Sequence, residues 1–126
     1  MKVQSLSNLE LEIMNVVWEG ENCSVREVLT KISQKKNLAY TTVATILGRL
    51  LEKGLVVRNE KNFVIHYSPK ISKAEYSRSL SGTFFSKFFQ SYGDIALASF
   101  AESIEKLPKD KKKHLLDLLE KNHENK

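Results

Sequence analysis

Residues 40–53 would place hydroxyl and guanidinium groups on one face of a helix. Apolar residues recur there at three- and four-residue spacing and would form its buried stripe: Val43, Ile46, Leu47 and Leu50. The opposite face then consists of small and polar residues: Thr41, Thr42, Ala44, Thr45, Gly48 and Arg49. Threonine hydroxyls can bond phosphates or base edges, and arginine can bond a phosphate or a guanine. This face predicts contact with DNA, although the pattern alone also fits an ordinary solvated helix.

Neighbouring residues extend this candidate surface. Tyr40 at the helix start can stack or can donate a hydrogen bond to a phosphate, but it can equally pack on the next turn. Arg58 and Lys61 in the following segment suit phosphate contacts, the alternative being solvated turn charges. Lys53 is better explained by the negative end of the helix dipole. The candidate DNA contacts are therefore Tyr40, Thr41, Thr42, Thr45, Arg49, Arg58 and Lys61.

The residue types that support catalysis or metal binding are scattered along the chain. His66 falls in an expected strand, and His114 and His123 are nine residues apart, not at the spacing that pairs ligands on one helix turn. The single Cys23 cannot form an internal disulfide, which fits a reducing compartment. We expect no catalytic site, metal site or cofactor, and hence a protein that is not an enzyme.

The composition indicates a small protein with an anionic partner. The 126 residues carry a formal net charge of +5 and are 41% hydrophobic, enough for one modest core. No segment approaches the roughly 20 apolar residues of a membrane span, and the N-terminus lacks the apolar run of a signal peptide. We expect a soluble cytoplasmic protein without membrane insertion.

Capping boxes predict where the first helices begin. Ser7 with Glu10, and Ser24 with Glu27, have the spacing that satisfies two backbone amides reciprocally. The first helix should end at Gly20 and the second at residues 35–37, while Gly54 should end the third.

A β-hairpin should follow these three helices. Residues 55–58 and 63–67 are β-branched or aromatic, and residues 59–62 form a polar turn with two asparagines able to adopt positive φ. Three helices and a hairpin are the order of a winged helix, whose third helix enters the major groove while the hairpin flanks the backbone. The fold class is therefore mainly α, an α+β winged helix, at residues 1–71.

Residues 72–126 should form a helical dimerisation region. A third capping box, Ser72 with Glu75, begins a long helix to about Tyr92, and shorter helices follow at 95–107 and after Pro108. About 50 residues in three helices are too few for an independent core, so a second copy should cover their apolar side. The expected interface comprises Leu80, Phe84, Phe85, Phe88, Phe89, Tyr92, Leu115, Leu118 and Leu119.

The chain resembles the penicillinase repressor family, the group of BlaI and MecI that also includes the copper repressor CopY. The resemblance runs nearly end to end and is carried by residues 11–18 (LEIMNVVW), 42–50 (TVATILGRL) with Lys53-Gly54, and 67–69 (YSP). It implies a homodimer whose winged-helix domains bind a two-fold operator over a promoter and block transcription. CopY senses copper through a C-terminal cysteine cluster that this chain lacks, so the resemblance is closer to BlaI and MecI.

The resemblance also implies release of the operator by proteolysis. In BlaI and MecI a cut between an Asn and a Phe follows activation of a membrane sensor of β-lactams, and Ser99 and Phe100 stand at the matching positions. Cleavage between these two residues is a hypothesis. The alternative is that Phe100 simply packs its helix against a neighbour. Thr41 and Ala44 stand where those repressors have basic residues on the recognition helix, and Phe63 replaces a basic wing residue.

The sequence thus predicts a dimeric repressor of a β-lactamase-type or other stress-response operon, inactivated by cleavage in its C-terminal region. Its expected partners are double-stranded operator DNA, a second copy of itself, and a membrane sensor metalloprotease or a protease that the sensor activates. The alternative is a winged-helix protein-interaction module without operator binding, since the third helix is not strongly cationic. Salt dependence of duplex binding separates the two hypotheses.

Overall fold

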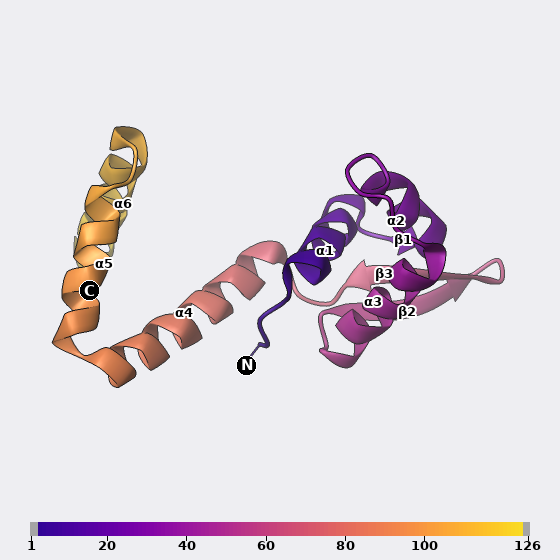
Figure 1. The fold of residues 1–126 in the computed structure, drawn as a ribbon, viewed down its shortest axis with the longest axis horizontal. Helices are drawn as coiled ribbons and strands as arrows, with labels where there is room; N and C mark the ends of the chain where they lie inside the picture. Colours follow the sequence, from indigo (N-terminus) through magenta and orange to yellow (C-terminus); the bar gives the residue numbers. More distant parts are fainter. Residues whose placement is uncertain (1–2, 125–126) are drawn as a thin grey trace. The chain divides into compact units, whose positions relative to one another are not determined.

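A computed structural model describes residues 3–124, which divide into one compact unit ending at Thr83 and another beginning at Phe84. The elements follow in the order α1 (Asn8–Gly20), β1 (Cys23–Ser24), α2 (Val25–Ile32), α3 (Tyr40–Glu52), β2 (Val56–Lys61), β3 (Val64–Pro69), α4 (Lys73–Tyr92), α5 (Asp94–Glu105) and α6 (Lys109–Glu124) (Figure 1). No helix in the described part of the chain has the length and apolar character needed to cross a membrane.

Both predicted capping boxes at the start of the chain are formed. The Ser7 hydroxyl accepts from the Glu10 amide at 3.2 Å, and the Glu10 carboxylate accepts from the Ser7 amide at 2.9 Å. Ser24 and Glu27 make the same pair of bonds, each at 3.1 Å. The starts of α1 and α2 are therefore confirmed, whereas α2 ends at Ile32, earlier than residues 35–37 suggested.

The N-terminal unit is built on one apolar core that α1, α2, α3 and the strands share. The predicted stripe of α3 is buried as expected: Val43, Ile46, Leu47 and Leu50. In the other elements, the core members with under 2% exposure are Ile13, Met14, Val17, Val28, Leu55 and Val56. With one side of α3 in this core, its other side must face outward.

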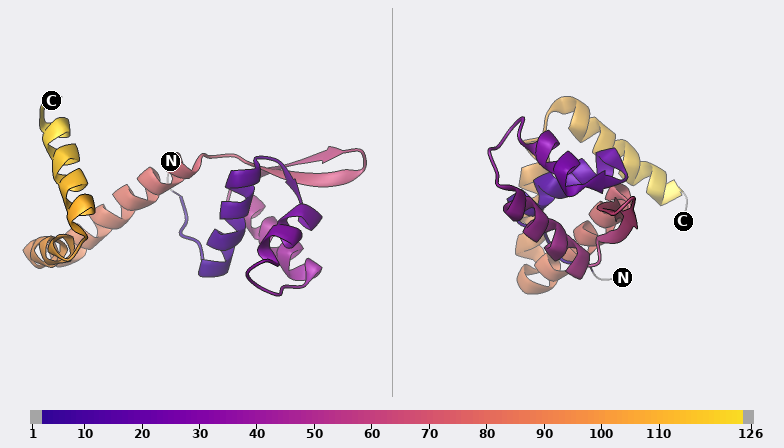
Figure 2. Two further views of the ribbon diagram at one scale, coloured as in Figure 1. Left: turned by 90° about the horizontal axis from the view of Figure 1, so that it is seen from above. Right: turned by 90° about the vertical axis from the view of Figure 1, so that its right-hand side faces the viewer.

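The hairpin of β2 and β3, here called the wing, pairs Lys61 with Val64 and extends beyond the helices of its unit (Figure 2). Its loop is therefore Asn62–Phe63, at φ 52° and 66°, the geometry of a two-residue hairpin turn. The expected turn at residues 59–62 was wrong in position, because Asn59, Glu60 and Lys61 continue the strand. Only Asn62 of the two candidate asparagines has the predicted positive φ.

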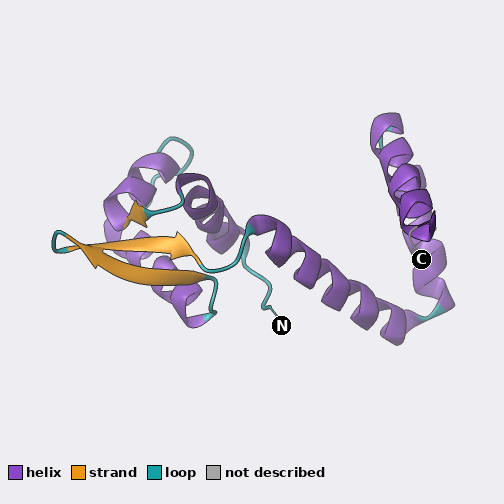
Figure 3. Cartoon of the chain, turned by 180° about the vertical axis from the view of Figure 1, so that it is seen from behind, coloured by secondary structure: helices purple, strands orange, loops and turns teal. Residues whose placement is uncertain are grey.

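The sheet has a third strand that was not predicted. Cys23 and Ser24 form β1, which pairs with β3 opposite Tyr67 and His66 and gives the order β1-β3-β2 (Figure 3). Two residues are too few to show a strand periodicity, so the pairing is visible only in the folded chain. Three helices with this small sheet confirm the winged-helix prediction.

The start of α4 belongs to the N-terminal unit. Trp18 donates from Nε1 to the Ile71 carbonyl at 2.9 Å and lies 5.7 Å, ring to ring, from Tyr76. The Tyr76 hydroxyl donates to the Gln4 carbonyl at 2.7 Å, and Leu80 packs against the same core. The division between the two units thus falls within α4, and the functional boundary at residue 71 stays a prediction.

A partly buried ion pair joins the beginning of α1 to the end of α3. Lys53 Nζ lies 2.9 and 3.0 Å from the two carboxylate oxygens of Glu10, whose side chain is 7% exposed. The Ser7 amide first, and Lys53 next, lower the pKa of Glu10. Lys53 therefore has two roles: it joins α3 to α1 through Glu10, and it lies at the negative end of the α3 dipole.

Replacing Glu10 with Gln should lower the free energy of unfolding at pH 7 by about 2 kcal/mol, because Lys53 loses its partner and the capping bond weakens. Because the folded pKa of Glu10 is depressed, its stabilisation exists above the unfolded pKa and is lost as pH falls through the folded pKa. Urea unfolding at pH 7 and at pH 3 should show a variant defect that shrinks in acid.

Glu12→Gln is the matched control, since Glu12 pairs with Lys36 on the surface at 2.9 Å. We expect it to change stability by under about 0.5 kcal/mol. Equal effects of the two substitutions at pH 7 would contradict a special role for the Glu10–Lys53 pair.

Candidate nucleic-acid interface

The exposed side of α3 presents an aligned row of three side chains. Thr41, Thr45 and Arg49 are separated by four residues each, so they lie one above another along the helix, and all three are exposed. Thr42 beside them is half-buried. We call Thr41, Thr45 and Arg49 the α3 row.

The hydroxyl of Thr45 is already used as a donor within the helix. Its Oγ1 donates to the Thr41 carbonyl at 2.8 Å, which leaves lone pairs and the methyl group directed outward. In this rotamer Thr45 can accept from a base amino group or touch a thymine methyl, but it cannot donate to a phosphate. Arg49 supplies the donors that Thr45 lacks.

The N-terminus of α3 differs from those of α1 and α2. Ala39 stands at its N-cap, makes no side-chain capping bond, and no acidic residue lies in the first turn. The Thr42 amide donates to the Ala39 carbonyl at 3.1 Å, so the amides of Tyr40 and Thr41 are the ones that can bond an external acceptor at the positive end of the helix dipole. Such an arrangement beside the α3 row suits a phosphate oxygen.

Arg26 adds a cation that sequence reasoning missed. From α2, its Cζ lies 5.0 Å from the ring centroid of Tyr40, close enough for a cation–π contact. Both side chains are exposed at the start of α3. The residues are 14 positions apart, and no sequence spacing signals the contact, which depends on how α2 packs against α3.

The two predicted wing cations do not form a single patch. Arg58 pairs with Tyr67 and Lys61 with Val64 in the hairpin register. Because strand side chains alternate, these two pairs lie on opposite faces of the wing. Both cations are exposed, so each is available to a phosphate, but from different sides.

Polar contacts fix the base of the wing to the rest of the unit. The Asn22 side-chain oxygen accepts from the Ser68 hydroxyl at 2.9 Å and from Nδ2 of the Asn59 side chain at 3.5 Å. His66 Nε2 lies 3.8 Å from Glu27, whose pKa is lowered first by its capping bonds to Ser24 and also by His66. The wing therefore has a defined direction relative to α2.

Within residues 3–124, no group of three or more His, Cys, Asp or Glu side chains is arranged to hold a metal. Cys23 is buried, and burial together with the nearby Glu27 carboxylate raises the pKa of its thiol. A buried, protonated thiol is a poor nucleophile. It packs close to Gly20, where an added Cβ would lie 2.4 Å from Cys23 Sγ.

The C-terminal unit carries its aromatic residues in two groups. Phe85 contacts Phe89 and Phe100, with ring centroids 5.7 and 5.3 Å apart. Along α4, Phe84 stacks on Phe88 at 5.8 Å and Phe88 meets Tyr92 edge-on at 5.4 Å, while Phe84 and Tyr92 remain 62% and 61% exposed. The second group is here called the α4 stripe; its Phe88 is half-buried, but Phe84 and Tyr92 are not covered by the rest of their unit.

The other predicted interface residues are less uniform. Leu118 and Leu119 are exposed on α6, Leu115 is half-buried, and Leu80 is packed in the N-terminal unit. Among residues 84–123, Ala96 alone is buried. So little burial fits a segment whose stability comes from another chain.

Comparison with known proteins identifies the chain's relatives. A family model described as penicillinase repressor matches residues 6–121. The chain belongs to the penicillinase repressor family. It is 27% identical to the penicillinase repressor of Bacillus licheniformis over 98% of this chain and 95% of that one. It is 25% identical to the methicillin resistance regulatory protein MecI of Staphylococcus aureus (strain N315), over 95% and 97%.

Solved structures of family members match the N-terminal unit. The DNA-binding domain of the repressor BlaI is 31% identical with a TM-score of 0.53, covering 60% of this chain and 94% of that one. Monomeric Bacillus licheniformis BlaI in complex with the blaP half-operator is also 31% identical, with a TM-score of 0.51, covering 60% and 92%. Membership in this family makes the chain a transcriptional repressor and not an enzyme.

Proposed function

We propose that this protein represses transcription by binding operator DNA through α3 and the wing. The observation that carries the proposal is the α3 row, which lies opposite a buried stripe on the same helix. The uncapped start of α3 and the Arg26–Tyr40 contact add phosphate-binding groups at its N-terminal end. The similarity to BlaI, whose structure is known with a half-operator, supports the same use of this surface.

The charge of this surface comes from several elements. α3 contributes Arg49, while Arg26 comes from α2 and Arg58 and Lys61 come from the wing. These dispersed cations position the protein on phosphates without specifying the base sequence. Tyr40 and the threonines of α3 would contact the DNA in the region between those phosphate contacts. Thr41, Thr42 and Thr45 are then the residues that select bases, by hydroxyl and methyl contacts.

A homodimer would place two such surfaces on a two-fold operator. The exposed rings of the α4 stripe, Phe84 and Tyr92, together with Leu118 and Leu119 of α6, supply the apolar area that a second copy would cover. Once one half-site is bound, the second binds at a high effective concentration, which raises the overall affinity for the operator. This gain matters most for a repressor whose recognition helix is only weakly cationic.

Regulation by proteolysis is the finer part of the proposal. Ser99 and Phe100 lie within α5, where the Ser99 carbonyl accepts from Ser103 Oγ at 3.2 Å and Phe100 packs edge-on against Phe85. A protease would need α5 to open locally before it reached this bond. Cutting here would detach the last turn or more of α5 and all of α6 from the dimer.

The regulated operon would be of the β-lactamase type or would belong to another stress response.

Operator binding is tested by fluorescence anisotropy with the duplex of the chain's own promoter and a scrambled duplex, at several salt concentrations. We expect preference for the promoter, two chains per site, and a linear fall of log affinity with log salt. Arg26→Gln or Arg49→Gln should reduce the salt slope by about one per dimer half-site. Arg78→Gln on α4 removes one positive charge outside the candidate DNA-binding surface, so it should leave promoter affinity and the salt slope unchanged. Equal weak binding to both duplexes would instead favour the protein-interaction module.

The dimer is tested by replacing Phe84 and Phe88 together with Asp. Burying carboxylates in the interface is unfavourable, so sedimentation equilibrium should give the monomer mass, and promoter affinity should fall about 100-fold. Ser86→Asp adds a charge to the same helix away from the α4 stripe and is the control. A double variant that keeps the dimer mass would rule out this interface.

Proteolysis is tested by mass spectrometry of the chain recovered from its host before and after induction with a β-lactam. The expected product ends at Ser99, and it should accumulate as repression is lost. Release of the promoter by a chain that remains intact would contradict the cleavage hypothesis.

A further inference from the structure

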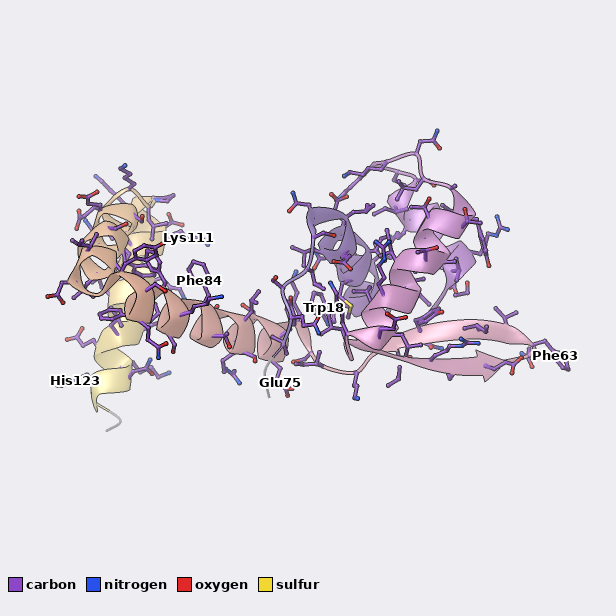
Figure 4. All side chains as sticks on the ribbon, turned by 60° about the horizontal axis from the view of Figure 1, so that its bottom comes forward. Trp18, Phe63, Glu75, Phe84, Lys111 and His123 are labelled. Atoms are coloured by element: carbon purple, nitrogen blue, oxygen red, sulfur yellow. The ribbon has the colours of Figure 1, made fainter. Side chains whose placement is uncertain are left out.

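The tip of the wing exposes an aromatic ring to solvent. Phe63 is 97% exposed, whereas the next most exposed large hydrophobic residue among those described, Ile95, is 77% exposed. Figure 4 shows its side chain at the far end of the hairpin, pointing away from the helices of the N-terminal unit. Neither core packing nor the fold of the hairpin accounts for a ring in this position.

The backbone at Phe63 is also unfavourable for its side chain. Its φ of 66° lies in the left-handed region, which suits Gly or Asn and is unusual for a bulky residue. A two-residue turn of this kind favours Asn-Gly, and the chain has Asn62-Phe63. Strained geometry and an unburied ring thus coincide in one residue, a combination that marks functional positions.

On the proposed function, the partner within reach of this ring is DNA. Leu55 at the root of the wing donates to the Leu50 carbonyl of α3 at 3.0 Å, so the wing starts directly from the end of the recognition helix. The six residues of β2 extend about 20 Å. That reach is comparable to half a turn of duplex, about 17 Å, which separates a major groove from the next minor groove.

The chemistry of the tip fits a minor groove. Phe63 cannot bond a phosphate, but apolar side chains do pack into the minor groove against sugars and between base steps. A two-residue turn is narrow enough to approach a groove about 6 Å wide. Lys61, two residues away and exposed, can neutralise a phosphate at the groove edge.

We propose that Phe63 inserts its ring into the minor groove of the operator, beside the major-groove segment that α3 contacts. This inference rests on the proposed function and assigns the wing an apolar contact in addition to its phosphate contacts. The ring would add affinity that salt does not screen, because it neutralises no phosphate.

The test uses the full chain with Phe63→Asn, which removes the ring and suits the positive φ. We expect promoter affinity to fall about tenfold while the melting temperature is unchanged or higher and the salt slope stays constant. Asn62→Gly changes the same turn but keeps the ring, and should bind like the unmodified protein. Lys61→Gln should instead lower the salt slope by about one per half-site.

Hydroxyl-radical footprinting on the promoter duplex locates the contact, because the radical attacks sugars from the minor groove. The unmodified protein should protect sugars on the flank of each half-site, and Phe63→Asn should lose that protection alone. Equal affinity and equal protection for the two proteins would overturn the inference. So would a loss of affinity accompanied by dissociation of the dimer, which would assign the ring to a protein contact. If the unmodified protein does not bind its promoter, the proposed function fails first and this inference with it.

Discussion

Burial of one side of α3 determines what its other side can present. Val43, Leu47 and Leu50 are fully buried, so α3 cannot rotate without exposing them to water, and the α3 row is held outward. The Glu10–Lys53 pair then ties the end of the same helix to the start of α1. The orientation of the candidate DNA surface thus depends on the core and on a polar contact at its edge.

The elements around α3 compensate for what that helix lacks. Thr41 and Ala44 bring no charge to its outer face, and Thr45 uses its proton within the helix. Cations from α2 and the wing, together with the amides of Tyr40 and Thr41 at the helix start, supply the attraction to phosphate. In this arrangement affinity is distributed over several elements, while discrimination between bases is left to a few small side chains and to the wing tip.

Features with a local cause could be predicted from the sequence, and those that depend on packing could not. The capping boxes at Ser7 and Ser24 act over three residues, and the α3 stripe follows helical periodicity, so both were visible in the chain. The wing turn was misplaced because Asn59 and Asn62 suit a turn equally, and only strand pairing decides between them. β1, the Arg26–Tyr40 contact and the Glu10–Lys53 pair join segments far apart in sequence, and no local pattern encodes them. The predicted DNA contacts on α3 are adjacent in space, whereas Arg58 and Lys61 face opposite ways.

We propose that α3 and the wing act as one DNA-binding surface. The most direct measurement is a titration of ¹⁵N-labelled full-length protein with its promoter duplex, followed by amide chemical shifts. We expect the largest changes at Thr41, Thr45 and Arg49, at Arg26 and around Asn62–Phe63, with small changes in α6. Saturating binding that leaves the α3 amides unshifted, or shifts concentrated in α6, would rule out this surface.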